Sequence, residues 1–158
     1  MFRRSALNGE FLARDGPGKV DTQVEPNQIT GKCVLEKIAY IAIAGAVGTL
    51  TRYGVVSLFQ RDGASGMPWG VFAANMAGSL LFGLIWAMSE ERGWISENAR
   101  VVALVGFLGA FTTFSTFAFD NVQMARASEW GWFAANLTLT NVGGLAFVYA
   151  GFRIVRSI

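Results

Sequence analysis

Uncharged hydrogen-bonding side chains recur inside the most apolar parts of this 158-residue sequence. Asn75 and Ser79 lie four residues apart, which places them on one face of a helix. Amides and hydroxyls donate hydrogen bonds without carrying a charge. They can bond a neighbouring helix, or they can line a path for an anion. Further groups of this kind are Thr112, Thr113, Ser115 and Thr116, and then Asn136, Thr138, Thr140 and Asn141.

The segment 106–120, GFLGAFTTFSTFAFD, adds five phenylalanines to these hydroxyls. The edge of an aromatic ring is electropositive. Ring edges and the amide of Asn75 could therefore replace the hydration of a small anion, whose transfer into an apolar medium otherwise costs roughly tens of kcal/mol. A plainer interpretation is a helical stripe of phenylalanines that faces lipid or core, and composition alone favours it. The members of this stripe would be Phe107, Phe111, Phe114 and Phe117.

Several classes of function are excluded by residue types that the sequence lacks. The chain has no histidine, and its single cysteine, Cys33, has no partner for a metal site or a catalytic pair. We therefore expect no enzymatic activity. Apart from Arg52, the long apolar segments contain no residue that is charged at neutral pH, whereas a proton-coupled exporter of organic cations ordinarily needs a carboxylate there. No basic run suggests binding to nucleic acid.

Four long apolar segments supply the elements that must position these groups. Each has 19 to 23 residues, and about 20 residues of helix cross a ~30 Å hydrocarbon layer. Tryptophans lie at the ends of the segments, where the membrane interface favours amphipathic rings. The sequence therefore predicts an all-α membrane protein with four transmembrane helices in a lipid bilayer. The segments are residues 38–59, 68–88, 101–119 and 130–152.

The third segment contains a pair of residues that is unfavourable to a continuous helix. Thr112 and Thr113 are adjacent and β-branched, and Gly109 lies close by. These residues predict a break near the middle of the third helix. Such a break is tolerated only where protein or a cavity covers it, and it frees backbone carbonyls that can bind a cation.

Small residues recur at intervals of four along three of the segments. This spacing lets helix backbones approach closely, within one chain or between subunits. We therefore expect tight helix contacts at these positions. They are Ala44 and Gly48 in the first segment, Gly70, Ala74 and Gly78 in the second, and Gly106 and Ala110 in the third.

The ends of the chain indicate the domain organisation and the topology. Residues 1–34 read as a flexible polar tail that lacks the apolar core of a secretory signal, and residues 35–158 form the transmembrane domain. With four spans, both termini share a side of the membrane with the second connection. That side carries more Lys and Arg, which predicts termini inside the cell. Lys32, Lys37, Arg92, Arg100, Arg153 and Arg156 lie there, against Arg61 and Arg126 opposite.

Three motifs in order carry a resemblance to a known family. They are AGAVGTLTRY (44–53), WGVFAANMAGSLLFG (69–83) and GFLGAFTTFSTF (106–117). Over about residues 38–152 the sequence resembles the CrcB/Fluc family of fluoride channels. The resemblance implies an antiparallel, dual-topology homodimer in a prokaryotic plasma membrane, with two parallel pores through which cytoplasmic fluoride leaves passively.

The resemblance also implies roles for individual residues. Fluoride would meet the amide of Asn75, ring edges and hydroxyls, and a central structural sodium ion would bind backbone carbonyls that the break exposes. A polar track on the fourth helix would complete the path, although the spacing of NLTLTNVGG leaves its register open. The implied pore residues are Asn75, Phe114, Phe117, Ser115, Thr116, Thr138 and Asn141, with Thr140 a further candidate; Arg52 lies at a vestibule, and Gly109 and Thr112 hold sodium.

The sequence departs from the family pattern at a few positions and leaves other functions open. Ala44 and Ala110 replace glycines, and Val71 lies where threonine is frequent. A coupled fluoride/proton transporter is one alternative to a passive channel. A membrane scaffold without transport is another.

Overall fold

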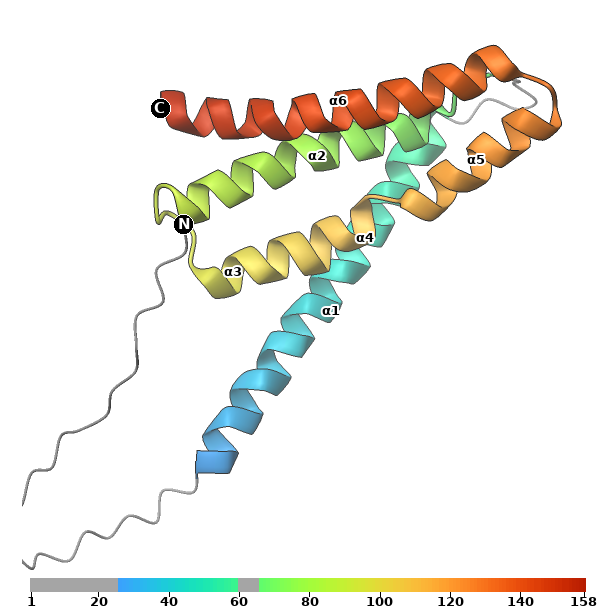
Figure 1. Ribbon diagram of the computed structural model, residues 1–158. Coiled ribbons are helices and arrows are strands. Elements are labelled where there is room, and N and C mark those ends of the chain that lie inside the picture. The colour runs from blue at the N-terminus through green and yellow to red at the C-terminus, as the bar shows by residue number, and fades with distance from the viewer. Residues whose placement is uncertain (1–25, 60–65) are drawn as a thin grey trace, which may run out of the picture.

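The regular structure of the described residues is helical throughout. The computed structural model describes residues 26–59 and 66–158 (Figure 1). The predicted tail lies outside these residues except for its last part, because the first helix begins at Pro26; the tail and the domain boundary stay predictions. The helices are α1 (Pro26–Phe59), α2 (Trp69–Glu90), α3 (Glu97–Val101), η1 (Val102–Leu108), α4 (Gly109–Phe111), α5 (Phe114–Arg126) and α6 (Trp130–Ser157), of which η1 is π-helical.

Four helical segments are long and apolar enough to cross a membrane, which confirms the predicted number of spans. The third is longer than its apolar core because Ser96 caps its start, accepting a hydrogen bond from the Ala99 amide at 3.3 Å. The fourth continues through Arg153 and Arg156 to its last turn. The spans are Val34–Phe59, Trp69–Glu90, Glu97–Arg126 and Trp130–Ser157.

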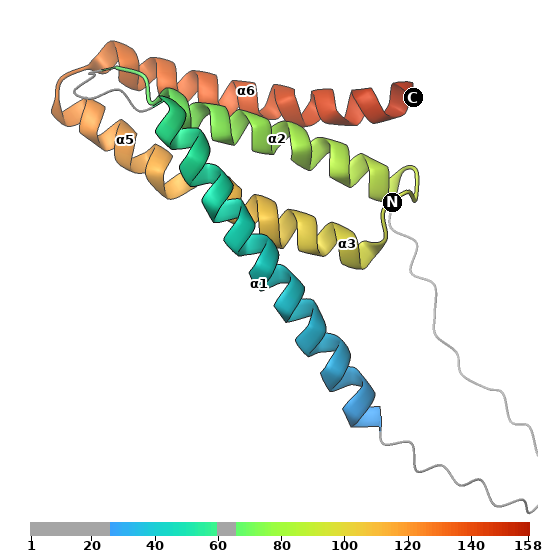
Figure 2. The ribbon, with the colours of Figure 1, turned by 180° about the vertical axis from the view of Figure 1, so that it is seen from behind.

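The two long helices α2 and α6 lie side by side, and α1 crosses the bundle obliquely (Figures 1 and 2). The start of α1, the α2–α3 connection and the C-terminus all lie toward one end of the molecule. The end of α1 and the α5–α6 turn lie toward the other. This arrangement places the second connection on the same side as the start of α1 and the C-terminus, as the four spans predicted.

Glycines let the helices approach to backbone distance. A Cβ on Gly48 would lie 2.3 Å from the Phe107 carbonyl oxygen, so the tight helix contact predicted at this position is confirmed, and its partner is the third span. A Cβ on Gly78 would lie 2.2 Å from Thr112 Cγ2. The closest approach of α2 to α6 was not predicted: a Cβ on Gly83 would lie 2.2 Å from the Val148 carbonyl oxygen.

Charged side chains close the end of the bundle that holds the C-terminus. Arg156 donates to both carboxylate oxygens of Glu91, at 2.7 and 2.5 Å, and this contact holds the pKa of Glu91 below its ordinary value. Arg92 donates to the carbonyls of Val155 and Arg156 at 3.0 and 3.2 Å. The α2–α3 connection is thereby fastened to the last turn of α6.

The third span is broken where the two threonines predicted it. Thr112 has φ −80° and ψ 156°, and Thr113 has φ −147° and ψ 112°, so both are extended between α4 and α5. The Thr113 side chain then caps α5 by accepting a hydrogen bond from the Thr116 amide at 3.3 Å. The chain therefore leaves helical geometry for two residues and resumes it at once.

Candidate functional site

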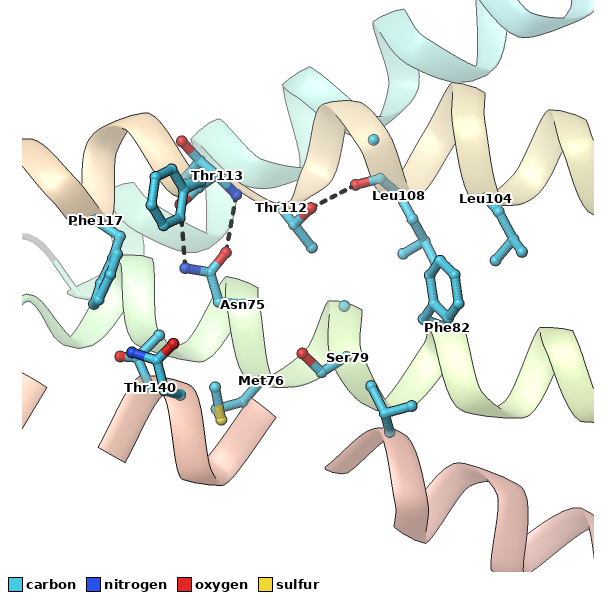
Figure 3. A pocket seen from close by; sticks show the side chains of 15 residues that line it. Asn75, Met76, Ser79, Phe82, Leu104, Leu108, Thr112, Thr113, Phe117 and Thr140 are labelled. Carbon is cyan, nitrogen blue, oxygen red and sulfur yellow. Dashed lines mark hydrogen bonds between the residues drawn. The ribbon is translucent and has the colours of Figure 1, made fainter. Parts of the chain in front are cut away.

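A cavity of about 520 Å³ lies beside the break, between α2, the third span and α6 (Figure 3). Its lining residues carry no ionisable group. At membrane depth such a wall offers hydrogen bonds without fixed charge. The polar side chains on it are Asn75, Ser79, Thr112, Thr113, Thr140 and Asn141, and the aromatic ones are Phe82, Phe114 and Phe117.

The Asn75 side chain reaches from α2 to the break and makes two hydrogen bonds with the backbone of Thr113 (Figure 3). The Thr113 N–H donates to Asn75 Oδ1 at 2.9 Å, and Asn75 Nδ2 donates to the Thr113 carbonyl at 3.2 Å. An amide nitrogen carries two hydrogens, so one N–H of Asn75 remains after these bonds. The predicted pore amide therefore lies on the cavity wall and also holds the break.

The break leaves two carbonyls without their usual helical partners. In a continuous helix the Thr113 N–H would donate to the carbonyl of Gly109, but it donates to Asn75 instead. The Thr116 N–H would likewise serve Thr112, but it donates to Thr113 Oγ1. Hard cations prefer such oxygen ligands, so this donor set fits the sodium ion that the resemblance implied.

The break also divides the predicted stripe of phenylalanines, so the interpretation as one continuous stripe is wrong. Phe107 and Phe111, before the break, stack with ring centroids 5.6 Å apart and join the core around Ala74 and Leu108. The two rings after it line the cavity. Their centroids are 5.9 Å apart with the planes tilted by 46°. Phe117 is only 5% exposed, whereas Phe114 is 79% exposed.

The two hydroxyl residues that follow the break, Ser115 and Thr116, do not line this cavity. Thr113 Oγ1 lies 2.9 Å from Thr116 Oγ1 and 3.4 Å from Ser115 Oγ. Ser115 is exposed and does not line the cavity. Thr116 lines a second cavity of about 590 Å³ at the junction of α1, α2 and α5, where Asp120 and Glu129 also lie. Ser115 and Thr116, both predicted pore residues, therefore do not share a cavity with Asn75 within one subunit.

The structure gives the register of α6 that the sequence left open. Thr140 and Asn141 line the main cavity, whereas Thr138 is exposed and lies outside it. Thr140 Oγ1 donates to Asn136 Oδ1 at 3.2 Å, and Asn136 is 1% exposed. Its Nδ2 has no hydrogen-bond partner within the part of the chain that the structure describes. The spacing of four between positions 136 and 140 was the signal that could have favoured this pair over Thr138.

Arg52, the predicted vestibule residue, is half-buried in α1 and lines neither of these cavities. The structure therefore brings together Asn75, the two cavity phenylalanines, the freed carbonyls and part of the predicted α6 track. Arg52, Ser115, Thr116 and Thr138 lie apart from that group.

Comparison with known proteins agrees with the motifs. The family model described as CrcB-like protein, Camphor Resistance (CrcB), matches residues 39–152. A Nitrosococcus oceani protein named fluoride-specific ion channel FluC is 48% identical over 123 residues, covering 78% of this chain and 98% of its own length. A FluC of Solidesulfovibrio magneticus is 41% identical over 125 residues, covering 79% of this chain and 100% of its own length.

These relatives are ion channels and not enzymes, as the absence of histidine led us to expect. A further FluC, from Nitratidesulfovibrio vulgaris, is 40% identical over 124 residues, or 78% of this chain and 100% of its own length. The matched region includes most of each of the four membrane helices, together with the break and the residues that line the cavity. This multi-pass membrane protein therefore belongs to the CrcB/FluC family.

Proposed function

We propose that this chain is a fluoride-selective channel through which cytoplasmic fluoride leaves a prokaryotic cell passively across its plasma membrane. One observation carries the proposal: uncharged donors and aromatic rings line a cavity at membrane depth, and no carboxylate of the described residues lies among them. A carboxylate there would repel the anion. The relatives of this chain are named as fluoride-specific ion channels.

The chemistry of the wall suits the smallest halide. Removing a small anion from water is costly, so several donors must replace its hydration shell together. The remaining N–H of Asn75 is one such donor, and the second N–H of Asn141, left after its bond to the Leu137 carbonyl, is another. The Thr140 hydroxyl would join them by turning from Asn136 Oδ1 to the anion. Phe114 and Phe117 would present electropositive ring edges between them.

We further propose that a second, antiparallel copy completes each of two pores. The cavity is not fully enclosed by one subunit, and polar groups such as those on its wall are not left facing lipid. Phe114 is exposed in one subunit, so a partner would cover it. Ser115, Thr116 and Arg52, which lie away from the cavity within one subunit, would act in the assembled dimer. Thr138 lies outside the cavity of one subunit, so a place for it on the path would require the partner.

A structural sodium ion would bind the carbonyls of Gly109 and Thr112 that the break frees. When bound, it would supply positive charge at the centre of the assembly without a basic side chain in the narrow path. The chain itself would position these carbonyls, because Asn75 on α2 bonds the break and keeps it beside the cavity.

Fluoride efflux from proteoliposomes, followed with a fluoride electrode, tests the proposal. We expect rapid release of fluoride and negligible release of chloride under the same gradient. Equal passage of chloride would refute selectivity. Uphill fluoride movement driven by a pH gradient alone would instead identify a coupled transporter, and absence of all flux would identify a scaffold.

A further inference from the structure

Asn75 connects two parts of the molecule that act on ions of opposite charge. We propose that it is a positioning residue: its amide keeps the break in the third span open and so keeps the Gly109 and Thr112 carbonyls available to a cation. This inference deepens the proposed function and rests on it for the identity of the cation as sodium.

The first step of the argument concerns the Thr113 N–H. This group donates to Asn75 Oδ1 at 2.9 Å, and the Asn75 Nδ2 returns a bond to the Thr113 carbonyl at 3.2 Å. The amide thus pairs with the extended Thr113 as a neighbouring strand would. Without it, the Thr113 N–H would lack a partner at membrane depth, and the nearest helical acceptor would be the Gly109 carbonyl.

The second step concerns the Thr112 carbonyl. It is free because the Thr116 N–H donates to Thr113 Oγ1 at 3.3 Å, and Thr113 can cap α5 only while its backbone is extended. Two bonds from Asn75 hold that backbone conformation. One side chain on α2 therefore controls both carbonyls.

The third step concerns the neighbour of Asn75 on α2. Gly78 lies three residues further along and on the same side of the helix. A Cβ there would lie 2.2 Å from Thr112 Cγ2 and 3.4 Å from Phe111 Cδ1. A glycine at this position lets the break lie against α2, within reach of the amide. Asn75 thus bonds Thr113, and Gly78 makes room for Thr112 beside it.

The test separates the amide's role in holding the break from its role on the anion path. Thermal unfolding of the full-length reconstituted protein is measured in sodium chloride and in N-methyl-D-glucamine chloride. We expect sodium to raise the midpoint of the wild type, and Asn75→Ala to lose this rise. Asn75→Asp should keep the rise, because a carboxylate oxygen still accepts from Thr113, but it should slow fluoride efflux at least tenfold because the donor is lost.

Ser79→Ala is the matched control, since Ser79 lies on the same wall one turn away and makes no bond to the break. It should keep the full sodium effect. A full sodium effect in Asn75→Ala, a lost one in Asn75→Asp, or none in the wild type would overturn the inference. Wild-type fluoride efflux, measured in parallel, reports on the proposed function separately.

A measurement on the wild type covers the case in which Asn75→Ala does not fold. The side-chain amide resonance of Asn75 is followed by solid-state NMR while sodium is exchanged for N-methyl-D-glucamine. We expect this resonance to shift, because the amide shares the Thr113 peptide with the break. An unchanged resonance, alongside a sodium-dependent shift of the Gly109 carbonyl, would show that the two sites are independent.

Discussion

Helix α2 meets its two neighbours in different ways. Toward α6 the contact is between backbones: a Cβ on Gly83 would lie 2.2 Å from the Val148 carbonyl oxygen, and one on Gly151 would lie 2.7 Å from the Leu80 carbonyl oxygen. Toward the third span α2 also approaches closely at Gly78, but there the Asn75 side chain makes hydrogen bonds across to the break, and a cavity remains beside them. The α2–α6 contact has no space for a larger side chain, whereas the cavity between α2 and the third span has space for an ion.

The polar groups follow the same division. On α6 they are satisfied largely within their own helix, since Thr140 donates to Asn136 and Asn141 donates to the Leu137 carbonyl at 2.6 Å. On α2, Asn75 bonds across to another span. The α2–α6 pair therefore acts as a frame, and the broken span is the part whose conformation depends on its neighbour.

The largest effect is expected from a change in the frame. Gly83→Val would place side-chain atoms where the Val148 carbonyl now lies. Overpacking of this kind costs about 1–3 kcal/mol or more, against a total stability of about 5–15 kcal/mol. We expect a markedly lower unfolding midpoint and poor recovery of folded protein. Gly131→Val is the control, since a Cβ there meets nothing within 4 Å. An equal loss of stability in both variants would contradict the importance of the α2–α6 contact.

A smaller effect is expected from the rings at the cavity. Replacing Phe117 or Phe114 by Ile should slow fluoride efflux roughly 5- to 10-fold, because an aromatic edge contact is worth about 1 kcal/mol. Phe117 is buried, so its replacement should also lower stability slightly, whereas that of the exposed Phe114 should not. Unchanged efflux in both variants would favour rings that serve packing alone.

The register of α6 gives a paired prediction of smaller size. Thr140→Val removes a cavity hydroxyl and should slow efflux about fivefold, since a hydrogen bond contributes about 1 kcal/mol. Thr138→Val changes a side chain outside the cavity of one subunit and should leave efflux close to that of the wild type. The reverse order of effects would place Thr138 on the path through the partner subunit.

The smallest effect is expected at the charged end of the frame. Arg156 lowers the pKa of Glu91 below 4.5, so this pair stabilises the fold above that pH and stops doing so as the pH falls through the lowered value. Unfolding midpoints between about pH 7 and pH 3 should therefore fall slightly less in Glu91→Gln than in the wild type. Identical pH profiles would show that the pair contributes nothing to stability.

Sequence reasoning succeeded where local chemistry decides the outcome. Adjacent threonines near Gly109 predicted the break, and the length of the apolar segments predicted the spans. It failed where the outcome depends on how helices rotate against one another. The break separates Phe107 and Phe111, which join the core, from Phe114 and Phe117, which line the cavity, so the four rings do not form the one stripe that a continuous helix would give.

The residues alone are enough to specify four apolar helices, a weak point in the third and a supply of neutral donors, because hydrophobicity and helix propensity are properties of short stretches of chain. Folding decides which donors meet. Asn75 and Thr113 are 38 positions apart, and their pairing needs the close approach of α2 that Gly78 allows. Thr140, and not Thr138, reaches the same cavity because packing against α2 sets the rotation of α6. Distances between helices are set by side chains on both partners, and no single segment contains that information.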